Sequence, residues 1–151
     1  MSDISKTAQA MIDRCLFQRT RTAARAVTRF YDDQLRTTGL RATQANVLAT
    51  IAAKGELTIS ALSDELGMDR TTLTRNLRPL EQRKLVAISP EGRHRARLVR
   101  LSSTGVAALG AIAAQWEKAQ SSLERSLGEA GVASVRDATA AITSSASRPR
   151  R

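Results

Sequence analysis

The sequence predicts a mainly α-helical protein with one small β-hairpin. Through most of the 151 residues, apolar side chains recur every three or four positions, which is the period of an amphipathic helix. Between residues 85 and 101 the pattern changes to the alternation of a strand, interrupted by Pro90, Glu91 and Gly92, which are typical of a turn. Short helices followed directly by a hairpin indicate a winged helix-turn-helix.

The first element is predicted as one amphipathic helix from about Lys6 to Arg36, ended by Gly39. Thr43 is the expected N-cap of a second helix, which Gly55 closes. The first helix carries an apolar face at spacings of three, four and seven: Ile12, Leu16, Ala23, Val27, Phe30 and Leu35.

Two shorter helices are expected next. Thr58 caps the first of them and Gly67 stops it, and Asp69 caps the second. The second buries a stripe of three leucines, and Pro79 inside it predicts a bend or a weakened last turn. The stripe consists of Leu73, Leu77 and Leu80.

A long fifth helix begins at Ser102 or Ser103, and Gly128 and Gly131 are expected to separate it from a sixth. The first and fifth helices are longer than a winged helix-turn-helix requires, so their apolar stripes indicate a homodimer, unless they simply pack on each other. We therefore expect a helical dimerisation region from both termini and a basic, disordered tail. The predicted boundaries are 1–38 and 102–145 for dimerisation, 39–101 for the winged helix-turn-helix, and 146–151 for the tail.

Positive charge is concentrated in one segment. Residues 70–100 contain nine Lys or Arg and two Glu, so nine minus two, or seven, of the net ten positive charges lie in thirty-one residues. Such a concentration favours a phosphate-bearing partner. The chain has only four aromatic residues, which leaves little for base stacking on single strands and favours double-stranded DNA.

The helix that starts after Asp69 presents a candidate DNA-reading face opposite its leucines. Small hydrogen-bonding residues near a helix N-terminus and longer cations beyond them suit the major groove. Arg70 and Arg78 flank this face and are better placed for phosphates. A solvated polar face is the alternative. The candidate contacts are Arg70, Thr71, Thr72, Arg75, Asn76 and Arg78.

The hairpin carries Arg93, Arg95 and Arg97 at alternate positions, which places all three on one side of a strand. Guanidinium groups so arranged repel one another unless an anion lies against them, and a hairpin tip of this kind can enter the minor groove. The alternative is a charged strand edge that prevents aggregation.

The chain resembles the MarR family of winged helix-turn-helix regulators. The resemblance is carried by RTAARAVTRFYDDQL, GLRATQANVLATIA, ELTISALSDELGMDRTTLTRNLRPLEQRKLV and RLVRLSSTG. It implies a repressor-like homodimer, built from the first, fifth and sixth helices, on a pseudo-palindromic operator. It also implies base reading by Thr71, Thr72 and Arg75 and a wing contact by Arg95. Position 93 is Arg where the family usually has an orienting Asp, and Glu91 is the acid that could replace it.

The resemblance also implies a signal that releases DNA. Members of the family often bind a lipophilic or aromatic acid between the dimer helices and the DNA-binding part, where arginines of the first helix could meet the anion or instead be solvated or paired with acids. Cys15 is similar in place to the thiol of peroxide-sensing members, although a half-buried cysteine acting as a small hydrophobe is the alternative. The arginines in question are Arg19, Arg21, Arg25 and Arg29.

Other function classes have little support. One cysteine and one histidine, His94, in different segments do not suggest a metal site, and no nucleophile has a base and an orienting acid, so neither cofactor nor enzyme activity is expected. No signal peptide or membrane span is evident, which predicts a cytoplasmic protein. The alternative to a sequence-specific regulator is a non-specific architectural DNA-binding protein.

Overall fold

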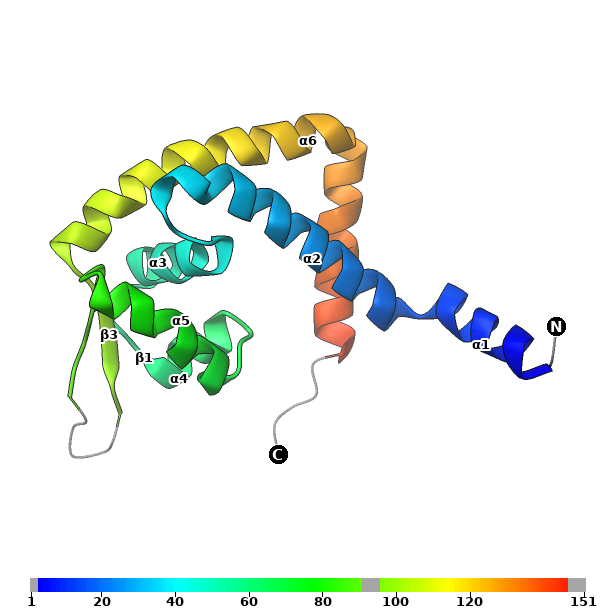
Figure 1. The fold of residues 1–151 in the computed structure, drawn as a ribbon, viewed down its shortest axis with the longest axis horizontal. Coiled ribbons are helices and arrows are strands. Elements are labelled where there is room, and N and C mark those ends of the chain that lie inside the picture. The colour runs from blue at the N-terminus through cyan, green and yellow to red at the C-terminus, as the bar shows by residue number, and fades with distance from the viewer. Residues whose placement is uncertain (1–2, 91–95, 147–151) are drawn as a thin grey trace.

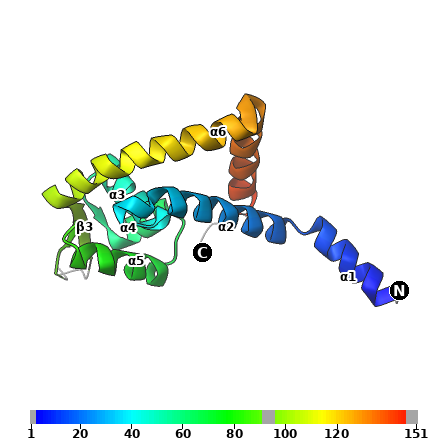
Figure 2. The same cartoon turned by 45° about the horizontal axis from the view of Figure 1, so that its top comes forward.

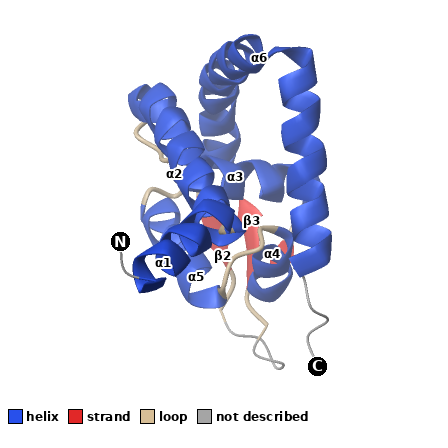
Figure 3. Cartoon of the chain, turned by 90° about the vertical axis from the view of Figure 1, so that its right-hand side faces the viewer, coloured by secondary structure: helices blue, strands red, loops and turns tan. Residues whose placement is uncertain are grey.

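The structure is a computed structural model that describes residues 3–90 and 96–146 (Figure 1). Helices make up most of it, and the short strands lie together beside the smaller helices (Figure 3). None of the helices among the described residues is long and apolar enough to cross a membrane. The helices are α1 (Asp3–Arg14), α2 (Leu16–Leu35), the 3-10 turn η1 (Arg36–Thr38), α3 (Ala42–Lys54), α4 (Ile59–Glu65), α5 (Arg70–Gln82) and α6 (Ser103–Ala146).

The strands form a small antiparallel sheet in the order β1–β3–β2. β2 (Val86–Ile88) and β3 (Leu98–Leu101) are the two arms of the predicted hairpin. β1 (Leu57–Thr58) pairs with β3 and was not expected, because two residues are too few to show an alternating pattern. The predicted fold class, mainly α with a small β wing, is confirmed.

One apolar core joins the short helices to the long ones. The leucines of α4 and α5 are fully buried, with Leu62, Leu73 and Leu80 at 0% exposure. Leu35 of α2 and Ile112 of α6 belong to the same buried cluster. The helix-turn-helix is therefore held directly against α2 and α6.

The first predicted helix is broken in two. Cys15 has an extended backbone, with φ −74° and ψ 103°, and its sulfur accepts the backbone N–H of Gln18 at 3.5 Å. The carbonyl of Asp13 accepts a hydrogen bond from Arg19 Nη2 at 2.7 Å. The single helix from Lys6 to Arg36 was therefore a wrong prediction, because the amphipathic period runs through a break that side-chain capping stabilises without Gly or Pro. In Figures 1 and 2, α1 points away from the rest of the chain.

The start of α3 also differs from the prediction. Arg41, rather than Thr43, is the N-cap residue. Asp32 of α2 accepts the backbone N–H of Ala42 at 2.7 Å and lies 3.7 Å from Arg41. A carboxylate of α2 thus satisfies one of the free N–H groups in the first turn of α3.

Several helix ends agree with the sequence. Gly55 is the C-cap of α3, and the Thr58 side chain caps α4 by accepting the N–H of Ala61 at 3.1 Å. At the start of α6, Ser102 Oγ accepts the N–H of Gly105 at 2.9 Å.

Of the residues predicted to disturb the long helices, only one interrupts its helix. α5 continues through Pro79 to Gln82, so the proline does not end the helix. α6 is interrupted at Gly128, where φ is 67° and ψ is 166°, and Figure 1 shows the sharp change of direction. Gly131 is helical, so only the first of the two predicted breaks is found. Residue 146, assigned to the tail, is the last residue of α6, and residues 147–151 lie outside the described residues.

Gly105→Ala is expected to destabilise the fold. A Cβ at this position would lie 2.0 Å from the Leu85 carbonyl oxygen and 2.9 Å from Leu101 Cδ2. Relieving such a contact requires the backbone to move, which costs about 1–3 kcal/mol or more. Gly110→Ala is the matched control, because nothing lies within 4 Å of its added Cβ, and a helix interior gains about 0.5–1 kcal/mol from that change. Urea unfolding of both variants measures the difference, and equal midpoints would contradict the close contact.

Candidate nucleic-acid interface

The N-terminus of α5 is organised by Asp69. Its carboxylate accepts the backbone N–H of Thr72 at 2.8 Å and the Thr72 hydroxyl at 2.7 Å. These two hydrogen bonds lower the pKa of Asp69, and the bond from the hydroxyl has the larger effect. The predicted cap is confirmed, and it fixes the first turn of α5.

The outer face of α5 presents the predicted side chains to solvent. Thr71, Arg75 and Arg78 are exposed, opposite Leu73, Leu77 and Leu80, which are buried. Within residues 3–90 and 96–146, the guanidinium groups of Arg75 and Arg78 make no hydrogen bond or ion pair. Both cations are therefore available to an anionic partner. Arg70 differs, because its Nη2 donates to Ser60 Oγ of α4 at 2.5 Å.

Two of the residues predicted to contact DNA are bonded within the chain. Thr72 and Asn76 are half-buried. The amide oxygen of Asn76 accepts a hydrogen bond from Thr43 Oγ1 of α3 at 3.3 Å, and its nitrogen donates to the Thr72 carbonyl at 2.9 Å. Both ends of the Asn76 amide are therefore engaged within the chain.

Of the wing arginines predicted to contact DNA, Arg97 lies among the described residues. Arg97 is half-buried, and its Nε donates to the Ser89 carbonyl at 3.4 Å across the hairpin. Ser89 Oγ also accepts the N–H of Leu98 at 2.9 Å. The predictions for Arg93 and Arg95, and the suggestion that Glu91 replaces the family's Asp, lie outside the described residues.

One basic residue of the charged segment has a structural role that its charge alone did not reveal. Arg83 Nη1 donates to the carbonyl oxygen of Gly39 at 2.7 Å, so it joins the end of α5 to the turn before α3. Arg100 of β3, by contrast, is exposed and faces Ala87 of β2 in the strand register.

Acid is expected to weaken the start of α5. Because the folded pKa of Asp69 is lowered, its carboxylate stabilises the fold above the unfolded pKa of about 3.9, and this contribution is lost as the pH falls through the folded pKa. Asp69→Asn keeps an N-cap acceptor without a titrating group. The melting temperature of Asp69→Asn should therefore fall less than that of the wild type between pH 5 and pH 2. Parallel pH profiles would show that the Asp69 cap has no such effect.

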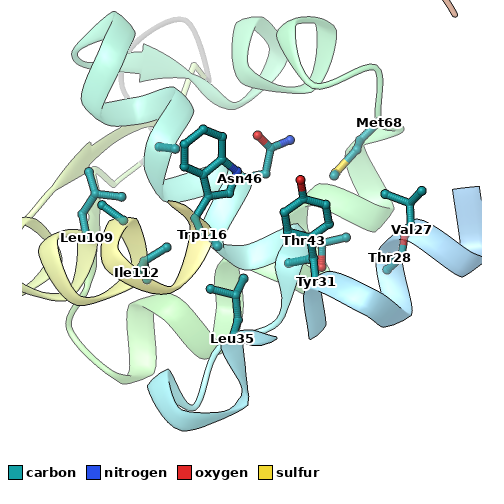
Figure 4. Close-up of a pocket in the computed structure, with 14 residues that line it drawn as sticks. Val27, Thr28, Tyr31, Leu35, Thr43, Asn46, Met68, Leu109, Ile112 and Trp116 are labelled. Atoms are coloured by element: carbon teal, nitrogen blue, oxygen red, sulfur yellow. The ribbon is translucent and has the colours of Figure 1, made fainter. Parts of the chain in front are cut away.

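A cavity of about 510 Å³ lies behind this interface, bounded by α2, α3 and α6. Figure 4 shows side chains from these helices converging on it together with Met68, which comes from the turn before α5. The sequence did not identify it, because its walls come from distant segments. Its lining residues are Val27, Thr28, Tyr31, Leu35, Ala42, Thr43, Ala45, Asn46, Ala49, Met68, Leu109, Ile112, Ala113 and Trp116.

The cavity wall is mainly apolar, and the four arginines suggested for an anionic ligand are not among its lining residues. Among its polar lining groups is the hydroxyl of Tyr31, which donates to Gln120 Oε1 of α6 at 2.5 Å. Burial, and then the nearby Glu124 carboxylate, raise the pKa of Tyr31, so the hydroxyl stays protonated at neutral pH.

Comparison with known proteins agrees with this arrangement. A model of the MarR family matches residues 38–97. The DNA-bound transcriptional regulator MosR of M. tuberculosis is 34% identical, and the match covers 88% of this chain and 96% of MosR with a TM-score of 0.79. No curated protein sequence matches the chain.

More distant structures share the fold. A mutant of E. coli MarR in complex with operator DNA is 21% identical over 87% of this chain and 96% of its own, with a TM-score of 0.76. S. aureus MepR in a DNA complex is 19% identical over 87% and 98%, with a TM-score of 0.75. With the family model and the MosR match, these findings show that the chain belongs to the MarR family of DNA-binding transcriptional regulators, which are not enzymes.

Proposed function

We propose that the protein is a homodimeric repressor that binds a pseudo-palindromic operator and releases it when a small lipophilic molecule binds. The exposed row on α5, which consists of Thr71, Arg75 and Arg78, carries this proposal. Thr71 near the N-terminus is short enough for close approach to a base edge, and Arg75 on the next turn is long enough to bind a guanine edge. Arg78, further along the exposed face, is placed for a phosphate, as is Arg97 in the wing.

Exposed apolar side chains support the homodimer. On the first two helices Met11, Leu16 and Phe17 are 67–70% exposed, and beyond the bend of α6 Val135 is 49% exposed. Monomeric proteins rarely leave so many large apolar residues in water along adjoining elements. A second copy, related by a two-fold axis, would cover them and place two α5 helices about 34 Å apart, one turn of DNA.

The cavity supports a small-molecule effector. Its volume of about 510 Å³ lies within the range of ligand sites, and its wall is mainly apolar with a few polar groups, as such sites usually are. Because no Lys or Arg lines it, we favour a neutral lipophilic compound over the aromatic acid that the family suggests. Burying a carboxylate there would leave its charge unpaired.

Selection of bound sites from random DNA tests the proposed function. A sequence-specific regulator should yield a symmetric site that it binds about a thousandfold or more tightly than random DNA at the same salt concentration. A non-specific architectural protein would yield no shared sequence and nearly equal affinities. Repeating the selection with neutral lipophilic compounds and with aromatic acids then tests the effector class.

An oxidant sensor is a second candidate, favoured by the place of Cys15. The thiol caps α2 at the break between α1 and α2, so its oxidation by peroxide to a sulfenic acid, with release of water, would add an oxygen at this cap and alter the joint. Operator binding should then fall after treatment with peroxide, and Cys15→Ser, which keeps a capping side chain, should not respond. Equal responses of both proteins would exclude Cys15 as the sensor.

A further inference from the structure

The start of α3 lines the cavity and is also hydrogen-bonded to α5. Thr43 lines the cavity, and its hydroxyl donates to Asn76 Oδ1 of α5 at 3.3 Å. Figure 4 shows Thr43 and Tyr31 among the side chains that line the cavity. A single side-chain hydrogen bond therefore joins the cavity wall to the middle of α5.

This bond continues along one face of α5. Asn76 Nδ2 donates to the carbonyl of Thr72 at 2.9 Å, and the Thr72 hydroxyl donates to Asp69 at 2.7 Å. Spacings of three and four residues place Asp69, Thr72 and Asn76 on the same side of the helix. The series of hydrogen bonds thus extends from Thr43 to the N-cap of α5, beside the exposed row that begins with Thr71.

The cavity also contacts the other end of this series. Met68 lines the cavity and directly precedes Asp69 in the chain. The buried Ser63 of α4 holds this turn, because its hydroxyl donates to the Met68 carbonyl at 2.5 Å and its own carbonyl accepts the Met68 N–H at 3.0 Å. The cavity wall is therefore hydrogen-bonded to α5 at Asn76 and adjoins the N-cap of α5 through Met68.

We propose that Asn76 is a positioning residue rather than a base reader, and that its hydrogen bond with Thr43 is the link through which the cavity wall sets the orientation of α5. The inference rests on the proposed function, since it names how the cavity regulates the DNA-binding face. The half-buried amide of Asn76 is held by its oxygen on Thr43 and by one of its N–H groups on Thr72, and these two bonds fix its orientation against α3 and the α5 backbone.

A double-mutant cycle tests the link in the full chain. Thr43→Val, which removes the hydroxyl bonded to Asn76, and Asn76→Ala should each lower the affinity for the selected site about two- to tenfold, as expected for one neutral hydrogen bond, with little change on random DNA. The double variant should lose no more than Asn76→Ala alone. Thr50→Val, which removes a hydroxyl elsewhere on α3, should bind as the wild type does.

Two results would overturn the proposal. Wild-type binding by Thr43→Val together with weak binding by Asn76→Ala would make Asn76 a direct DNA contact, and additive losses would show that the two side chains act separately. A loss of global stability would not change the ratio of selected-site to random-DNA affinity in folded protein, so this ratio separates positioning from simple destabilisation.

Hydrogen exchange of the free protein separates this proposal from the proposed function. In Thr43→Val the amides of the first two turns of α5 should exchange about two- to tenfold faster than in the wild type, and in Thr50→Val they should not. Unchanged protection in Thr43→Val would refute the link. If site selection yields no preferred DNA while exchange responds as expected, the proposed function fails and the structural link stands.

Discussion

Arg75→Ala is expected to abolish most of the preference for the selected DNA site while leaving binding to random DNA nearly unchanged. Arg75 is exposed on the outer face of α5, one turn after Thr71, and makes no bond with another described residue. A cation at this place can donate two hydrogen bonds to a guanine edge, and losing such a pair costs about 1–3 kcal/mol of discrimination. Binding of both DNAs at a fixed salt concentration measures the change.

Arg78→Ala is the matched control for this prediction. Arg78 is also exposed on α5, but we expect it to contact a phosphate. Its removal should weaken binding to both DNAs alike and reduce the slope of log affinity against log salt by about one. If Arg75→Ala weakened both DNAs to the same extent as Arg78→Ala, the base-reading role of Arg75 would be disproved.

Leu16→Glu is expected to convert the proposed homodimer to monomers. Leu16 is 67% exposed in the single chain, at the start of α2, and we place it in the dimer interface. An unpaired charge buried there costs about 3–5 kcal/mol, and two-fold symmetry introduces two such charges. Sedimentation at micromolar concentration should therefore show monomers. Affinity for a site with two half-sites should fall by a factor of about 100 or more, since linkage of the two readers is lost.

Thr22→Glu provides a control of equal charge. Thr22 is an exposed polar residue of α2, so a carboxylate there stays in water and changes the electrostatic attraction to DNA by the same amount as Leu16→Glu. It should sediment as a dimer and bind DNA nearly as the wild type does. A dimeric Leu16→Glu with wild-type affinity would exclude the α1–α2 surface from the interface.

Local patterns predicted the parts that local chemistry stabilises. Thr58, Asp69 and Ser102 cap the helices that follow them because a side-chain oxygen two or three residues away satisfies a free N–H. The leucines of α5 are buried as the helical period required. The outward row on α5 followed from that burial, because opposite faces of one helix are related by geometry alone.

Features that depend on distant residues could not be predicted in this way. Asp32 of α2 accepts an N–H at the start of α3, and β1 forms only because β3 lies beside it. Asn76 was grouped with the DNA contacts because its position on α5 was known and its partner on α3 was not.

The sequence by itself therefore determined the class of fold, the order of its elements from α3 to α6 apart from β1, the helix that carries the exposed cations, and the family, because these follow from periodicity, capping and motif. Only the tertiary structure decided where the cavity lies, that no arginine lines it, and that Thr43 joins its wall to Asn76. The physical reason is that a cavity and a hydrogen bond between helices exist only once segments more than thirty residues apart are packed together, and no local pattern encodes that contact.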